Sequence, residues 1–415
     1  MRTVRPLSAL LLALLLGSGC TTSLQQGWIA FEQGDYGTAH DHWRPHAEAG
    51  DAEAQYLLGL MHDDGRGVPR DDVAAVAWYR RAAEQGHAAA QNNLGVHCLS
   101  GDGIEADPVS ATRWYRRAAA QGLVDAQNNL AVLLLSEHSP TRDSREGLRW
   151  LRRAAEQGHP RAQALLGSLY YNGINVPRDL ARAATWYERA ALQRVASAQH
   201  MLGEMYTRGE GVPVSEEMAA IWYRRAAEQG YPPAQNSLGL MLMNGAGVER
   251  DLDEARRWLE VSADQGTAEA QFALGWMYHR GHGVEANASA AARWIERAAV
   301  KGLPAAQASL GELLLQGRGV ARDHTQAMSW FELAASQGVA RASHRLGMLH
   351  ERGLGAEADH VAALMWYTRA AEAGHAPARE RRDLLASRMT AAEIDEAQRR
   401  VTGDGEVATV SVPVP

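Results

Sequence analysis

A tryptophan returns every 36 residues along most of this chain. Its nine copies stay in step from first to last: Trp78, Trp114, Trp150, Trp186, Trp222, Trp258, Trp294, Trp330 and Trp366. A fixed period of this length, kept over many copies, indicates a solenoid or array in which each unit packs on its neighbours. The period does not say which kind of solenoid, so the residues inside the unit must decide.

The residues around each Trp predict a helix with both ends marked. Seven residues before the Trp stands Asp, Asn or Ser in every copy, and these side chains can cap the first backbone N–H groups of a helix. Small residues, the Trp and the residue after it form an apolar face at helical spacing. Eight residues after the Trp, Gly closes eight of the nine copies, as expected at a left-handed helix stop. We expect Trp186 and Trp222 to be buried between neighbouring units.

A second apolar stripe predicts another helix before the first. Ala recurs 24 residues before the Trp and Leu recurs 20 before it in all nine copies, which is helical spacing. Gly stands between them and the Trp, 19 residues before it, in eight copies, where it costs a helix about 1 kcal/mol relative to Ala. That cost is understandable if two helices approach closely there. Each unit is therefore predicted to be a helical hairpin, and the fold to be an all-α, α/α-hairpin solenoid.

The full repeat resembles a known family. Residues 196–230 read A-x-A-Q-x-x-L-G, then G-x-G-V, then A-x-x-W-Y-x-x-A-A-x-x-G, which is similar to the Sel1-like repeat, a relative of the tetratricopeptide repeat. The resemblance covers residues 51–375 in nine copies. It implies a right-handed superhelix with terminal caps that serves as a protein-binding scaffold and not as an enzyme.

The start of the chain predicts export and lipidation. Residues 1–19 combine Arg2 and Arg5 with a short apolar run that ends in small residues, which is typical of an export signal. Because Cys20 follows these small residues at once, the segment resembles a bacterial lipoprotein signal with the lipid on Cys20. An ordinary signal followed by an incidental cysteine is the alternative. Residues 20–27 are expected to be the lipidated cysteine and a short linker, and resemblance places the protein at the outer membrane, facing the periplasm.

Both ends of the repeat array depart from the pattern. Residues 28–50 are predicted to be a degenerate N-terminal repeat, in which Asp35 caps the second helix and Trp43 takes the place of the repeat Trp. Residues 376–401 are predicted to form C-terminal capping helices, because Thr390 and Glu393 have capping-box spacing, and residues 402–415 a flexible tail. Inside the array, Arg194 replaces the closing Gly of the fourth unit. We expect local strain there and no domain boundary.

Charge and motifs argue against nucleic-acid binding and catalysis. The formal net charge is −7, whereas a nucleic-acid partner would require a basic face. The chain contains no P-loop, no zinc-protease motif and no serine-hydrolase motif. His40, His42 and His46 are poorly spaced for one metal ion on a helix, and Cys98 is expected to be a buried free thiol. No catalytic, cofactor or metal site is predicted.

A partner-binding surface is predicted on the first helices. Residues 22, 18 and 15 positions before each Trp lie opposite the core stripe at 100° per residue. In the sixth and seventh units this surface carries apolar residues where solvent alone would favour polar ones. Trp276 is the one Trp inside the nine units that lies off the 36-residue grid. The predicted site is Asn236, Leu240, Met243, Phe272, Trp276 and His279, with a secondary patch of Asn92, Val96, Leu99, Asn128, Val132 and Leu135. Burial of this stripe against neighbouring units is the alternative.

These features predict an envelope-anchored scaffold without catalytic activity that binds a protein or peptide. By resemblance to lipidated solenoids, it would serve the assembly of an envelope or exopolysaccharide-export complex. Two alternatives stay open: a secreted or surface-displayed virulence factor that binds a host protein, and a cell-wall-active enzyme.

Overall fold

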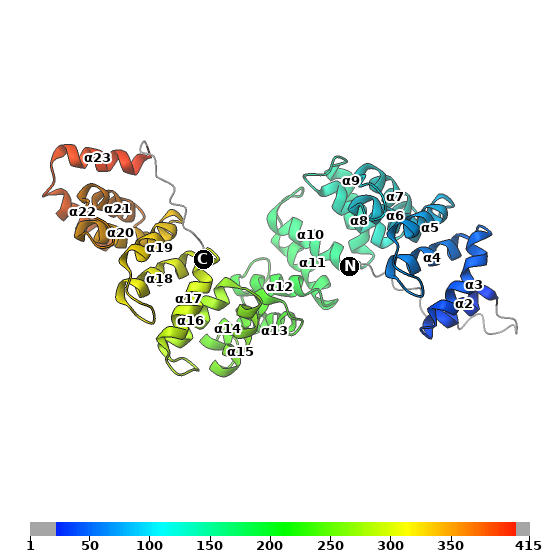
Figure 1. Ribbon diagram of the computed structural model, residues 1–415, viewed down its shortest axis with the longest axis horizontal. Helices are drawn as coiled ribbons and strands as arrows, with labels where there is room; N and C mark the ends of the chain where they lie inside the picture. Colours follow the sequence, from blue (N-terminus) through cyan, green and yellow to red (C-terminus); the bar gives the residue numbers. More distant parts are fainter. Residues whose placement is uncertain (1–21, 404–415) are drawn as a thin grey trace. The chain divides into compact units, whose positions relative to one another are not determined.

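The structure, a computed structural model, describes residues 22–403, and it contains helices and no strand in this range (Figure 1). The expected export signal and Cys20 lie outside the described residues, as does nearly all of the expected tail. The helices are α2 (Ser23–Glu32), α3 (Tyr36–Glu48), α4 (Ala52–Asp64), α5 (Asp72–Glu84), α6 (Ala88–Ser100), α7 (Pro108–Ala120), α8 (Val124–Leu135), α9 (Ser144–Glu156), α10 (Pro160–Asn172), α11 (Leu180–Leu192), α12 (Ala196–Arg208), α13 (Glu216–Ala227), α14 (Pro232–Asn244), α15 (Leu252–Asp264), α16 (Ala268–Arg280), α17 (Ala288–Val300), α18 (Pro304–Gln316), α19 (His324–Ser336), α20 (Ala340–Arg352), α21 (His360–Glu372), α22 (Ala376–Ala386) and α23 (Ala391–Thr402).

The chain forms two compact units, one ending at Gln193 and the other beginning at Arg194. The prediction of no boundary in the fourth repeat is therefore wrong. Arg194 has φ 64°, a left-handed conformation that costs a residue with a Cβ about 1–2 kcal/mol. The division falls at the one repeat whose second helix is followed by a non-Gly residue in this conformation.

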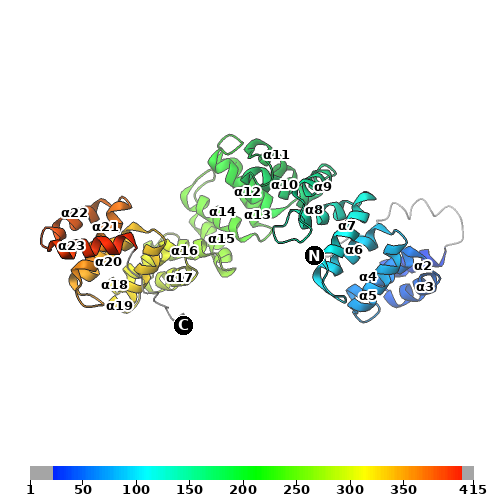
Figure 2. The ribbon, with the colours of Figure 1, turned by 90° about the horizontal axis from the view of Figure 1, so that it is seen from above.

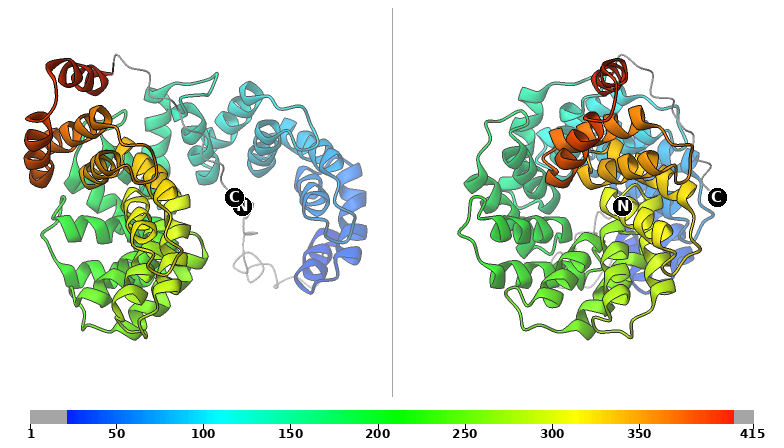
Figure 3. Two further views of the ribbon diagram at one scale, coloured as in Figure 1. Left: turned by 60° about the vertical axis from the view of Figure 1, so that its left-hand side comes forward. Right: turned by 90° about the vertical axis from the view of Figure 1, so that its left-hand side faces the viewer.

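Inside each unit the helices form hairpins that stack in chain order. The two helices of a repeat pack on each other, as α4 does on α5 and α16 on α17, and the second helix packs on the first helix of the next repeat. Figures 2 and 3 show these pairs from other directions. The α/α-hairpin solenoid is confirmed.

The predicted helix ends are confirmed. In all nine repeats the Asp, Asn or Ser side chain accepts a hydrogen bond from a backbone N–H in the first turn of the second helix. The eight closing glycines have φ between 82° and 98°, so the chain leaves each second helix through a left-handed residue.

The mid-helix Gly makes room for a large side chain of the second helix. A Cβ on Gly203 would lie 2.6 Å from Cε1 of Tyr223, so a methyl group has no room there. In the third repeat Ala131 replaces this Gly, and the second helix carries Gly147 where the other repeats have Ala. A Cβ on Gly147 would lie 2.9 Å from Cγ of Leu135. In the third repeat the glycine at the contact between the two helices therefore belongs to the second helix and not to the first.

The residue after each Trp is buried in the core, whereas the Trp itself is half-buried in every repeat except that of Trp222. Tyr79, Tyr187 and Phe331 are buried, whereas Trp186 is half-buried. The Arg189 guanidinium lies 4.6 Å from the Trp186 ring centroid, and the same stacking recurs at Trp222. Trp222 is buried as predicted, but the prediction for Trp186 is wrong, because part of its indole is in contact with solvent.

A line of glutamines joins successive repeats. The Gln at the start of a first helix donates to a backbone carbonyl of the preceding repeat, as Gln91 Nε2 does to Ala83 O at 3.0 Å. Its Oε1 accepts from the Gln that follows the second helix of its own repeat, as Gln91 does from Gln121 at 2.8 Å. The Gln side chains of the first helices are buried, and at most junctions within each unit both their N–H and their oxygen are paired. We call this line the glutamine ladder.

The ends of the array are helical. Helix α2 begins at Ser23, where Thr22 and Gln25 form a capping box, so the expected linker is wrong from Ser23 onward. Its residues Trp28 and Phe31 pack on Trp43, which is fully buried, and Asp35 caps α3 as predicted. At the other end α22 and α23 confirm the predicted capping helices, including the Thr390 capping box.

Candidate partner-binding site

An aromatic wall lies on the surface of α16. Phe272, Trp276 and His279 follow one another at helical spacing, so their side chains leave the same face of the helix. The Trp276 ring meets Phe272 edge to face at 6.1 Å and His279 at 5.4 Å between centroids. The Arg280 guanidinium covers Trp276 at 5.2 Å. Trp276 is nevertheless 36% exposed, so this wall is accessible.

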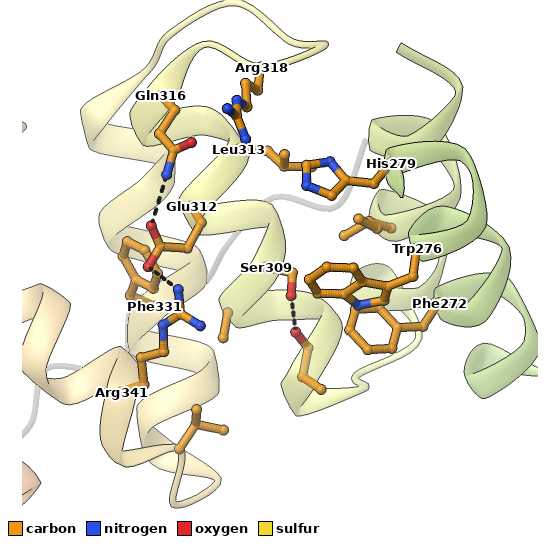
Figure 4. A pocket seen from close by; sticks show the side chains of 14 residues that line it. Phe272, Trp276, His279, Ser309, Glu312, Leu313, Gln316, Arg318, Phe331 and Arg341 are labelled. Atoms are coloured by element: carbon orange, nitrogen blue, oxygen red, sulfur yellow. Dashed lines mark hydrogen bonds and ion pairs between the residues drawn. The ribbon is translucent and has the colours of Figure 1, made fainter. Parts of the chain in front are cut away.

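Helix α18 supplies the opposite wall, and the two walls enclose a pocket of about 400 Å³ (Figure 4). Small residues of α18, Ala305 and Ala308, leave room for a guest in front of Trp276. Ile295, Leu313 and Phe331 contribute apolar surface, and Ser309 and Gln316 contribute polar groups. Mostly apolar walls with a few polar groups are typical of binding sites in proteins.

The rim of the pocket carries charges. Arg345 Nε donates to Glu312 Oε1 at 2.5 Å, and an N–H of Arg341 donates to the same oxygen at 3.3 Å. The Glu312 side chain is 13% exposed, whereas that of Arg341 is 64% exposed. Arg318 is exposed at the end of α18. Glu312 is thus paired with Arg341 and Arg345, whereas the guanidinium groups of Arg318 and Arg341 face solvent.

The structure brings together three of the six predicted site residues. Phe272, Trp276 and His279 line the pocket, whereas Asn236, Leu240 and Met243 do not. Leu240 and Met243 are half-buried and pack against the core of the neighbouring hairpins, and Asn236 Oδ1 is buried without a hydrogen bond. The alternative of self-packing therefore holds for the sixth repeat and not for Trp276.

The secondary patch also contains both accessible and buried residues. Leu99 and Val132 are 41% and 48% exposed, and Val96 and Leu135 are half-buried. Asn92 and Asn128 are buried, and Asn92 Oδ1 accepts from Asn129 Nδ2 at 3.0 Å. These two asparagines are part of the packing between repeats and offer little surface to a partner.

Sequence reasoning missed the α18 and α20 side of the pocket. Ala308 and Glu312 stand at the same repeat positions as Phe272 and Trp276, so the repeat register could have identified them. Arg341 lies three positions before the expected stripe begins, and Arg318 lies in the turn after α18. Nothing in the helical spacing connects those two residues to Trp276.

Other polar clusters have structural roles. His87 and His159 accept from the first turn of their helices and lie within 3.2 Å of acids of the preceding repeat. His97 Nε2 lies 3.4 Å from Asp63 in the core of the first unit, and Cys98 is buried as expected.

Within residues 22–403 no group of three His, Cys, Asp or Glu side chains is arranged to hold a metal ion. No helix in this range has the length and apolar character needed to span a membrane.

Nine consecutive segments of the chain match the Sel1 repeat. They are residues 52–87, 88–123, 124–159, 160–194, 196–231, 232–267, 268–303, 304–339 and 340–375. The chain belongs to the Sel1 repeat family. Sel1 repeat proteins act as scaffolds for protein–protein interaction and are typically non-catalytic, which agrees with an accessible apolar pocket.

Two solved structures share this repeat over nearly their whole length. One is c5321, a protective antigen present in uropathogenic Escherichia coli strains, at 32% identity, a TM-score of 0.61 and coverage of 91% of this chain and 90% of that one. The other is a Sel1 repeat protein from Oxalobacter formigenes, at 31% identity, a TM-score of 0.54 and coverage of 90% and 99%. No curated protein matches the chain.

Proposed function

We propose that this Sel1 repeat protein is a non-enzymatic scaffold that docks a partner protein in the pocket beside Trp276. The observation that carries the proposal is the position of Trp276. The repeat framework does not require a Trp there, yet it stands 36% exposed at the mouth of an apolar pocket. A large aromatic side chain in such a place is the usual anchor of a protein interface.

A photo-activated crosslinking residue in place of Ser309 tests the docking in intact cells, because Ser309 faces Trp276 across the pocket (Figure 4). We expect one dominant crosslinked protein that disappears when Trp276→Ala is added. The same residue in place of Arg293, exposed on α17, is the matched control and should not trap that protein. A crosslink from Ser309 that persists in the Trp276→Ala variant would mean that Trp276 is not the anchor of the docked protein.

The proposal extends to the location of the scaffold. A lipid on Cys20 would tether the protein to the outer membrane on the periplasmic side, where it would assemble an envelope or exopolysaccharide-export complex. Residues 1–19 support this through their basic start, short apolar run and small residues before Cys20. Labelling of growing cells with radioactive palmitate tests the anchor: the wild-type protein should be labelled and Cys20→Ala should not. Equal labelling of both would exclude lipidation at Cys20.

A second candidate is a surface-displayed protein that binds a host protein. It is favoured by the likeness to c5321, which is a protective antigen of uropathogenic strains. Protease treatment of intact cells separates the two candidates. Digestion of the protein in intact cells supports display at the cell surface, and digestion only after the outer membrane is opened supports the periplasmic scaffold.

A further inference from the structure

The mouth of the pocket is basic, although the whole chain is acidic. The formal charge of the chain is −7. Arg318 and Arg341 line the pocket, and Glu312 is the one acid among the lining residues. Glu312 already accepts hydrogen bonds from Arg341 and Arg345. A guest therefore meets a surplus of positive charge beside the apolar walls.

The two guanidinium groups have donors to spare. Arg341 makes one hydrogen bond to Glu312 at 3.3 Å and is 64% exposed, so most of its five N–H groups face solvent. The Arg318 backbone N–H donates to Leu313 O, but its guanidinium makes no hydrogen bond or ion pair with another residue of the range 22–403. In Figure 4 Arg318 and Arg341 lie at opposite ends of the α18 face, with Phe272 and Trp276 across from the stretch between them.

We propose that the pocket takes a peptide segment in which one bulky apolar side chain is flanked by carboxylates. The apolar side chain enters between Trp276 and Ala308, and the carboxylates bind the guanidinium groups of Arg318 and Arg341. Arginine binds carboxylates through paired, charge-assisted hydrogen bonds. A lysine in place of either acid would bring like charges together, which disfavours the wrong partner. This inference rests on the proposed function, because it specifies the chemistry of the partner segment.

A random peptide display library, selected on the purified full-length protein, tests the inference. We expect enriched peptides to combine an aromatic residue, Leu or Met with Asp or Glu nearby. Their affinity should fall about tenfold or more on Trp276→Ala, and also on Arg318→Glu combined with Arg341→Glu, as for the loss of one good contact. Arg318→Gln combined with Arg341→Gln removes the positive charges without adding negative ones and should give a smaller loss. Arg293→Glu, which reverses a charge at an exposed position of α17 outside the pocket lining, is the control and should bind normally.

Charge exchange provides the sharpest readout. An enriched peptide whose acids are changed to Lys should bind wild type poorly and bind the Arg318→Glu, Arg341→Glu variant better than wild type. Selected peptides that need Trp276 but show no acidic bias would overturn the inference while leaving docking at the pocket intact. Absence of any Trp276-dependent peptide would overturn it too, and the crosslink from Ser309 in cells would then decide separately whether the pocket docks a partner.

Discussion

Lys301 stands where the repeats on either side place a Gln of the glutamine ladder. Gln271 Oε1, which that Gln would bind, is buried without a hydrogen-bond partner. An unsatisfied buried acceptor costs about 1–3 kcal/mol. We predict that Lys301→Gln restores the bond and raises the free energy of unfolding by about 1 kcal/mol, measured by urea denaturation.

Lys301→Ala is the control for that experiment. It removes the same positive charge but supplies no amide, so it should give no gain. Equal stabilisation by both substitutions would mean that removal of the positive charge causes the effect. The missing ladder bond would then contribute nothing to the free energy of unfolding.

The residue after each Trp should matter more than the Trp. Tyr187 is 4% exposed in the core, whereas Trp186 is half-buried beneath Arg189. We predict that Tyr187→Ala lowers the free energy of unfolding by roughly 3–5 kcal/mol, as expected for removal of a large buried aromatic side chain. Trp186→Ala should cost less than half as much, because part of its indole already contacts solvent and the rest packs partly on the Arg189 side chain. Hydrogen exchange around α10 and α11 measures both, and the reverse order would contradict this account of the core.

Within a hairpin, the mid-helix Gly leaves space for the ring that packs against it from the second helix. A methyl group at Gly203 would lie 2.6 Å from the ring of Tyr223, so the ring or the helix must move. We predict that Gly203→Ala destabilises the second unit by about 1–3 kcal/mol, although Ala is the better helix former. The control is Gly37→Ala in the first turn of α3, where the nearest other atom to the new Cβ would be 3.9 Å away. That change should be neutral or stabilising in the same thermal unfolding measurement.

Acid should loosen the last hairpins first. Burial, with His375 and Arg345 nearby, lowers the pKa of His344 to about 4, and burial lowers the pKa of His350 and His375 as well. Arg381 acts in the same direction, and Glu312 opposes it. An unfolded His titrates near 6.5, so between about pH 6.5 and 4 the unfolded state binds more protons. Stability supplied by neutral His344 is therefore present above about pH 6.5 and is lost as pH falls to about 4.

Hydrogen exchange of α20 to α22 at pH 7 and pH 5, corrected for the intrinsic rate, measures this loss. His344→Gln should reduce the difference between the two pH values, because Gln does not titrate. An undiminished difference would assign the acid sensitivity to other groups.

The elements were predictable because each depends on local chemistry. The Asp caps, the closing glycines and the Thr390 capping box act within a few residues, so spacing alone located them. The repeat that ends at Arg194 has the same 36-residue spacing as the others, so the repeat length did not predict the division between the two units. The start of α2 was missed because its signal, Thr22 with Gln25, lies outside the 36-residue register.

The pocket was predicted on one side only. Helical spacing placed Phe272, Trp276 and His279 together, because all three belong to one helix. Arg341 reaches the pocket from another helix, and its direction depends on how α20 packs on α18. No period in the sequence carries that information.

Of the two compact units, the second holds the whole pocket, since its lining residues run from Phe272 to Arg341. We predict that a fragment of residues 194–403 folds and binds a selected acidic peptide with the affinity of the full chain. Circular dichroism at 222 nm measures folding, and fluorescence anisotropy of the labelled peptide measures binding. A folded fragment with much weaker affinity would mean that residues before Arg194 contribute to binding.

The glutamine ladder also bears on how such a chain can lengthen or shorten during evolution. A ladder bond joins residues 30 apart, as Gln265 and Gln235 are joined, and the carbonyl bond spans eight residues into the preceding repeat. Insertion or loss of a whole 36-residue unit re-forms both kinds of bond at the new junction. A change of any other size leaves amides buried without partners, which is costly. We therefore expect gene duplication and deletion to change chains of this kind in steps of one repeat, with the register of the remaining copies preserved.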